Sequence, residues 1–134
     1  MDIKQPFNLF QWIEKNRHLL KPPVGNKNLY VDAGDYIVMI VAGPNARKDY
    51  HYNETEELFF QLEGEIIVKT QQNNKCVEIP IKAGEMFLLP AKIPHSPSRS
   101  ENSIGLVIER VRKGSDMKDG LMWFCDSCNH PLFE

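Results

Sequence analysis

The stretch GPNARKDYHYNETEELFFQLEGEIIVKT (43–70), followed by AGEMFLLPAKIPHSPSR (83–99), decides the fold. Each stretch alternates short runs of β-branched and aromatic residues with turn-forming residues such as Gly, Pro and Asn, which is the pattern of short strands. The same pattern extends in both directions along the chain. Short strands are predicted at 29–32, 36–42, 58–62, 65–71, 76–81, 86–89, 104–111 and 121–124. Strands this short and this closely spaced predict a mainly all-β sandwich or barrel with jelly-roll connections.

One helix precedes these strands. Leu9, Trp12 and Ile13 begin a rough apolar stripe over residues 7–20, and Pro6 or Asn8 can open the helix. The prolines at 22 and 23 cannot continue it. We therefore expect a single N-terminal helix and no other.

The two stretches also carry candidate metal ligands. His51 and His95 each stand at a predicted turn beside a strand, among polar neighbours. Two histidines and one carboxylate form the ligand set of non-haem Fe(II) oxygenases, although Zn²⁺, Mn²⁺ and Ni²⁺ also accept it. The carboxylate could come from Glu54, Glu56 or Glu57, and the residues alone do not choose among them. The sequence YNETE (52–56) predicts a bend between His51 and Glu57, which on a continuous strand would share one face.

Length and charge limit the class of protein. The 134 residues form one domain in our interpretation, 1–134, and the formal net charge of −2 gives no reason to expect nucleic acid as a partner. No apolar run approaches the ~18 residues of a membrane span, and no signal-peptide pattern follows Met1. We expect a cytoplasmic protein without a membrane partner.

Cys125 and Cys128 have the spacing of half a tetrahedral thiolate site. Three states are open to them: free thiols, a local disulfide, or a four-cysteine site shared across a symmetric dimer. A cytoplasmic setting disfavours the disulfide, so we favour free thiols. Of the other histidines, His18 is expected to be structural, and His130 stays ambiguous.

Several motifs resemble those of a known family. Gly43, His51, Glu57 and Gly64, and then Gly84, Pro90 and His95, resemble the two motifs of the cupin superfamily. Asn53, Lys92 and Arg99 stand where cupins usually carry histidine, glycine and asparagine. A closer resemblance, from Pro6 to the last residue, is to the bacterial and fungal 3-hydroxyanthranilate 3,4-dioxygenase family. The segments that carry it are LLKPPVGN (19–26), GPNARKDYH (43–51), EELFFQLEGE (56–65), FLLPAKIPHSPSR (87–99), GLVIER (105–110) and WFCDSC (123–128).

This resemblance implies a cupin jelly-roll barrel and selects Glu57 as the carboxylate, so that His51, Glu57 and His95 hold Fe(II). It implies that Arg47, Arg99 and Glu109 are catalytic and bind substrate. Val24, Asn26 and Pro97 would add to the substrate site, with 24–26 as a movable cover. Residues 121–134 resemble the start of a C-terminal segment whose second Cys-x-x-Cys this sequence lacks. The family also implies a homodimer.

The chemistry implied by the family is ring cleavage. Fe(II) with three protein ligands keeps positions for the hydroxyl and amine of 3-hydroxyanthranilate and for O2. An arginine fork, best supplied by Arg99, matches the ring carboxylate, and Glu109 can take the hydroxyl proton as general base. The implied product is 2-amino-3-carboxymuconate semialdehyde, which closes to quinolinate, a precursor of NAD.

Three alternatives compete with this hypothesis. One is a non-catalytic cupin that binds a metal or a small carboxylate. Another is a thiol dioxygenase, although those cupins favour three histidines. In the third, Arg99 and Glu109 form an internal ion pair that only stabilises the barrel.

Overall fold

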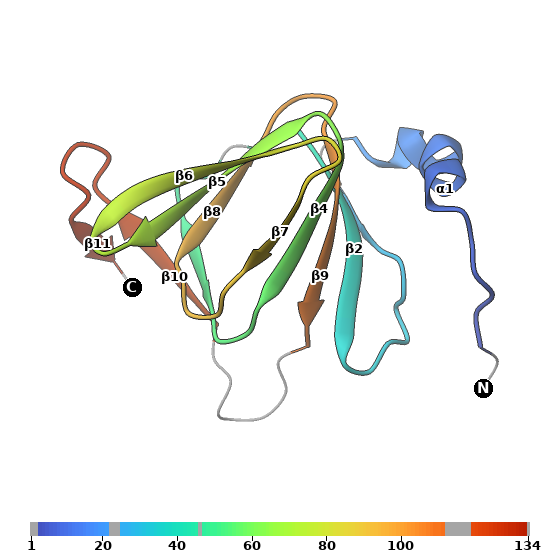
Figure 1. Cartoon of the computed structure of the whole chain (residues 1–134), viewed down its shortest axis with the longest axis horizontal. Coiled ribbons are helices and arrows are strands. Elements are labelled where there is room, and N and C mark those ends of the chain that lie inside the picture. Colours follow the sequence, from blue (N-terminus) through green and yellow to red (C-terminus); the bar gives the residue numbers. More distant parts are fainter. Residues whose placement is uncertain (1–2, 22–24, 46, 112–118, 134) are drawn as a thin grey trace.

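The computed structural model describes residues 3–21, 25–45, 47–111 and 119–133. Two antiparallel sheets curl around a common interior (Figure 1). The five-stranded sheet has the order β1 (Asn26–Asn28), β2 (Tyr36–Ala42), β9 (Ile104–Arg110), β4 (Glu57–Glu63) and β7 (Met86–Leu89). The six-stranded sheet has the order β11 (Pro131–Phe133), β10 (Asp119–Phe124), β3 (Tyr50–Asn53), β8 (His95–Arg99), β5 (Glu65–Gln72) and β6 (Lys75–Lys82). The predicted mainly-β barrel is confirmed.

The interior core holds the sheets together. Its centre is apolar: Phe59, Ile66, Val68, Ile81, Leu89 and Val107 are all buried and in contact. These residues come from both sheets at positions of period two, so one face of each strand points inward. Burying this many large side chains is the main source of stability for a chain of this length.

The helix α1 (Leu9–Asn16), followed by a 3-10 turn (Arg17–Leu19), covers one end of the outer face of the five-stranded sheet. Asn8 caps it, because its side chain accepts a hydrogen bond from the backbone of Gln11 at 3.0 Å. Ile13 packs with Ile40 and Ile104 in a second core. The predicted helix is confirmed, although its regular part ends at Asn16, short of Leu20.

The predicted strand at 29–32 is wrong, because β1 lies at Asn26–Asn28 and the chain then turns. The backbone N–H of Ala33 donates to the carbonyl of Tyr30 at 3.1 Å, which closes a tight turn. The chain therefore turns at 30–33, within the stretch that was predicted to be a strand. Leu29 packs against the second core beneath α1 instead of extending a strand.

Sequence reasoning also missed β3, β8 and β11. Strand β8 (HSPSR) has no large apolar side chain, and β3 (YHYN) has only four residues with His51 and Asn53 beside its tyrosines, so neither was recognised as a strand. Strand β8 forms because the long strand β5 pairs with it over Ile66–Thr70. His51 and His95 thus stand within strands, not at turns beside them. The predicted bend in 52–56 is confirmed at Glu54 and Thr55.

Two turns have backbone conformations that favour glycine. Gly64, between β4 and β5, has φ +70°, and a Cβ there would lie 2.9 Å from the Cα of Ser103. Lys92 has φ +64° although it is not glycine. It occupies the position where the cupin motif usually carries glycine, so the structure supplies the physical reason for that preference.

Candidate active site

A cavity of about 850 Å³ opens between the two sheets. Strands of both sheets supply its walls, so its polar side chains converge from opposite sides. Of the predicted site residues, it is lined by Asn26, Arg47, His51, Glu57, His95, Pro97, Arg99 and Glu109. The cavity therefore brings together every residue predicted for the substrate and the Fe(II) except Val24, which lies outside the described residues.

The two histidines are held by neighbouring strands. His51 of β3 is the direct antiparallel partner of His95 of β8, and their ring centroids are 5.9 Å apart. The His95 ring is buried, and its Nδ1 lies 3.0 Å from the carbonyl oxygen of Ile93. Because a carbonyl only accepts hydrogen bonds, Nδ1 carries the proton and Nε2 keeps its lone pair toward the cavity.

Burial also favours the neutral form of the His95 ring. It lowers the pKa of His95 below the ordinary value, opposed by the hydrogen bond to Ile93, and the neighbouring His51 lowers it further. Neutral imidazole is the form that binds a metal ion.

Glu57 approaches from the other sheet. It is buried, and its Oε1 lies 3.9 Å from Nε2 of His95. Asn53, buried at the end of β3, donates to the same oxygen at 3.5 Å. Asn53, which stands where cupins usually carry a histidine, thus contacts Glu57, the proposed carboxylate ligand. Glu56 is exposed whereas Glu57 is buried, as expected for neighbouring residues that point to opposite faces of a strand.

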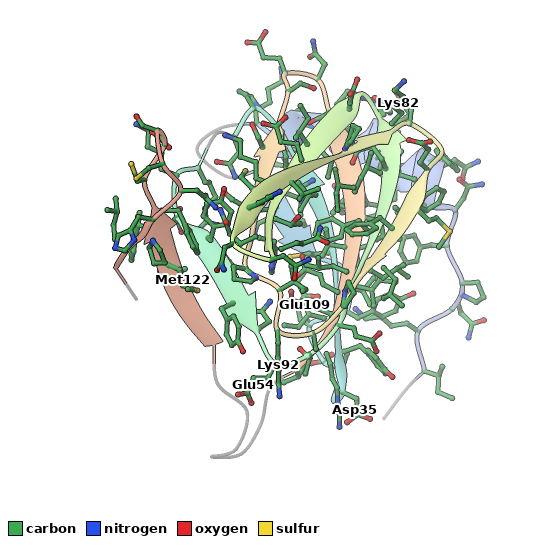
Figure 2. The ribbon with its side chains drawn as sticks, turned by 60° about the vertical axis from the view of Figure 1, so that its left-hand side comes forward. Asp35, Glu54, Lys82, Lys92, Glu109 and Met122 are labelled. Carbon is green, nitrogen blue, oxygen red and sulfur yellow. The ribbon has the colours of Figure 1, made fainter. Side chains whose placement is uncertain are left out.

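Glu57 and Glu109 are also direct cross-strand partners, in β4 and β9, and both line the cavity. Like charges directly opposite each other in a sheet are destabilising. A cation bound between the two carboxylates would relieve that repulsion. Figure 2 shows Glu109 near the middle of the molecule, whereas Asp35, Glu54 and Lys92 lie at one end.

The residues present fit a divalent metal in chemistry and placement. Two imidazoles and a carboxylate line one cavity, one imidazole has the correct tautomer, and a second carboxylate adds negative charge. Within the described part of the chain, no group of three or more His, Cys, Asp or Glu side chains is placed so that it could hold a metal ion as it stands. The fit is therefore one of donor type and location.

Arg99 carries a buried positive charge in this cavity. Burial lowers its pKa to about 10, and the negative charge of Glu57 opposes that shift. Among the residues that the structure describes, no carboxylate forms a salt bridge with it. A guanidinium of this kind is an obvious binding group for an anionic ligand, because a carboxylate would satisfy both its charge and its donors.

Arg47 is placed differently. Its Nε donates to Oδ1 of Asp49 at 3.0 Å, and its Nη2 contacts Oδ2 of the same carboxylate. Arg47 holds the pKa of Asp49 below the ordinary value through these bonds. Oδ2 of Asp49 is also 4.0 Å from Nε2 of His51. Sequence reasoning missed Asp49, and the short Arg-x-Asp-x-His spacing before and into β3 was the signal that could have found it.

Cys125 and Cys128 lie at the end of β10 as free thiols, with Cys128 exposed. The backbone N–H of Cys128 donates to Sγ of Cys125 at 3.3 Å. The Cys128 side chain and nearby backbone N–H groups lower the pKa of Cys125. This pair is apart from the cavity lining. A second metal at this pair, one of the alternatives to the favoured free thiols, stays untested.

Comparison with known proteins decides the family. A model of the 3-hydroxyanthranilic acid dioxygenase family matches residues 1–134. The chain belongs to this family. A protein of Xanthomonas oryzae named 3-hydroxyanthranilate 3,4-dioxygenase is 59% identical over 129 residues, which is 96% of this chain and 72% of that protein. One of the same name from Bacillus thuringiensis is 46% identical over 130 residues, covering 96% and 71%.

Solved structures show the fold. A cupin-2 domain protein of Shewanella frigidimarina superposes with a TM-score of 0.58 at 19% identity, over 75% of this chain and 92% of that one. A protein of Neisseria meningitidis gives 0.60 at 20% identity, over 81% and 100%. The predicted cupin fold and dioxygenase family are confirmed, and the alternative of a non-catalytic cupin is not favoured.

No helix among the described residues is long and apolar enough to cross a membrane.

Proposed function

We propose that this chain cleaves the ring of 3-hydroxyanthranilate with O2, using Fe(II) held by His51, Glu57 and His95. The observation that carries the proposal is the convergence of this ligand set and the buried cation of Arg99 in one cavity. Membership of the dioxygenase family supports the reaction. Bound there, Fe(II) supplies coordination positions and the electrons that let O2 react with the ring.

Arg99 binds the ring carboxylate. The guanidinium is already stripped of most of its water, so a bidentate carboxylate restores hydrogen bonds that the buried cation lacks. Because Asp49 occupies Nε and Nη2 of Arg47, that arginine has only part of its fork for the substrate. Arg99 is therefore the principal binding group for the substrate carboxylate, and Arg47 is a supporting one.

Glu109 receives the proton of the ring hydroxyl. It lines the same cavity as Glu57 and is its direct cross-strand partner, so its carboxylate faces the space that the ring would occupy. Met39, Val41, Val107 and Trp123 give the cavity apolar walls that exclude water around the ring. The ring then opens next to its hydroxyl carbon and yields 2-amino-3-carboxymuconate semialdehyde.

The homodimer is part of this proposal. Tyr36, Met86 and Leu88 are exposed on the outer face of the five-stranded sheet, beside the part covered by α1. An isologous contact between two such apolar faces would bury them. Sedimentation of the wild type and of Leu88→Glu tests it, and a wild-type monomer at micromolar concentration would contradict it.

Oxygen uptake tests the reaction itself. Fe(II)-loaded protein is mixed with 3-hydroxyanthranilate or with 2-aminophenol, which lacks the carboxylate. Arg99→Ala should lose roughly 2–5 kcal/mol of transition-state stabilisation for 3-hydroxyanthranilate and much less for 2-aminophenol. Unchanged kinetics and preference in this variant would show that Arg99 is structural.

A further inference from the structure

Gly105 of β9 lies directly beneath the Arg99 guanidinium. A Cβ built on Gly105 would lie 2.7 Å from Oε1 of Gln61 and 3.3 Å from Nη1 of Arg99. Both distances are tighter than ordinary van der Waals contact. The space that a side chain would need at this position is therefore occupied by the ends of Gln61 and Arg99.

Gln61 has a fixed orientation. It is 1% exposed, and its Nε2 donates to the backbone carbonyl of Glu63 at 2.8 Å. This bond identifies which end of the amide is nitrogen, so the oxygen is the end that lies against Gly105. Gln61 and Gly105 are also cross-strand partners in β4 and β9. The backbone of Gly105 and the amide oxygen of Gln61, here called the platform, border the same small space as Nη1 of Arg99.

We infer that Gly105 and Gln61 are positioning residues for the Arg99 guanidinium, and that they set the preference of the cavity for a ring that bears a carboxylate. The inference rests on the proposed function. Two parallel hydrogen bonds between a guanidinium and a carboxylate require the two groups to lie nearly in one plane. A displacement of Nη1 by a fraction of an ångström to one ångström breaks that alignment.

Arg99 depends on this platform because few other groups hold it. Within the described residues no salt bridge fixes the guanidinium, and its charge is buried. Glycine inside a strand costs about 0.5–1 kcal/mol relative to alanine, and it often marks a close approach of another group. The amide oxygen of Gln61 presents a partial negative charge without competing, as a full carboxylate would, for the site of the substrate.

The first test is Gly105→Ala, with Gly34→Ala as the matched control, since a Cβ on Gly34 meets nothing within 4 Å. The readout is the ratio of kcat/KM for 3-hydroxyanthranilate to kcat/KM for 2-aminophenol. We expect Gly105→Ala to lower this ratio by about 10- to 100-fold, mainly through KM for 3-hydroxyanthranilate. Gly34→Ala should keep the wild-type ratio.

The second test covers the case in which Gly105→Ala does not fold. Gln61→Glu keeps the shape of the side chain but adds a negative charge beside Arg99, whereas Gln61→Met keeps its approximate size without the oxygen. We expect Gln61→Glu to lower the ratio more than Gln61→Met, because the new carboxylate competes with that of the substrate. A role in packing alone would lower thermal stability in both variants without changing the ratio.

Wild-type ratios in folded Gly105→Ala and Gln61→Glu proteins would overturn the inference and leave the proposed function intact. A wild-type protein that shows no preference for 3-hydroxyanthranilate over 2-aminophenol would instead overturn the proposed function, and the inference with it. Binding of anthranilate and of aniline to the metal-free protein gives the same comparison without turnover. The variants should lose affinity for anthranilate alone.

Discussion

His51 of β3 and His95 of β8 are direct partners across the six-stranded sheet, with ring centroids 5.9 Å apart. Glu57 reaches the same cavity from the opposite sheet. The bend after β3 makes this possible, because it carries the chain from one sheet to the other within a few residues. A ligand set close in sequence thus comes from facing walls of the barrel.

The first prediction concerns Glu57 as the carboxylate ligand of the metal. Glu57→Ala should lose most of the bound iron and all oxygen uptake, because two imidazoles alone bind Fe(II) weakly. Glu56→Ala is the matched control, since Glu56 is its exposed neighbour. Iron content per chain after anaerobic loading and desalting measures the effect. Full iron occupancy in Glu57→Ala would contradict the assignment of Glu57 as the carboxylate ligand.

The second prediction concerns the destabilising effect of the buried Arg99 charge on the folded protein. Burial lowers the pKa of Arg99 to about 10, which means that the folded state disfavours its charged form. Arg99→Met should therefore raise the free energy of unfolding of the metal-free protein, by about 1–4 kcal/mol, while it lowers the rate with 3-hydroxyanthranilate. Urea unfolding and oxygen uptake measure the two effects. A variant that is both less stable and fully active would contradict this role.

The unequal arginines give the third prediction. Arg47→Ala should reduce the preference for 3-hydroxyanthranilate over 2-aminophenol less than Arg99→Ala does, because Asp49 already occupies two nitrogens of Arg47. We expect a loss of under about tenfold, against about 30-fold or more for Arg99→Ala. Equal losses of preference in the two variants would show that the arginines share the carboxylate.

The fourth prediction concerns pH. Burial lowers the pKa of His95 in the folded protein, so below the ordinary value of 6.5 the unfolded chain takes up this proton first. The contribution of His95 to stability is complete above about pH 6.5 and decreases as the pH falls. Between pH 7.5 and 5.5 the metal-free wild type should lose more of its unfolding free energy than His95→Gln does. Parallel pH profiles of the two proteins would contradict this.

Different features of the sequence predicted the barrel, the helix and the residues around the cavity. Short, nearly continuous apolar runs bounded by turn-forming residues identified strands such as 36–42 and 86–89. Resemblance selected Glu57, since spacing alone could not separate it from Glu54 and Glu56. Strands β3 and β8 escaped notice because the cavity requires polar residues where a core strand would carry apolar ones.

The contacts that refine the site depend on packing between strands far apart in sequence. Gly105 meets Arg99 only because β9 and β8 come from opposite sheets of a curled barrel. Gln61 has no motif of its own, and its role is visible only from burial and from the direction of its amide. Asp49 is the exception, because its short spacing from Arg47 and His51 could have been read from the chain.

Oxygen uptake by anaerobically reconstituted protein tests the central claim most directly. Protein loaded with Fe(II) should consume O2 and 3-hydroxyanthranilate in equimolar amounts, and the metal-free protein and loaded Glu57→Ala should consume neither. An Fe(II)-loaded wild type that takes up no oxygen with 3-hydroxyanthranilate, or a metal-free protein that turns over at the same rate, would contradict the account.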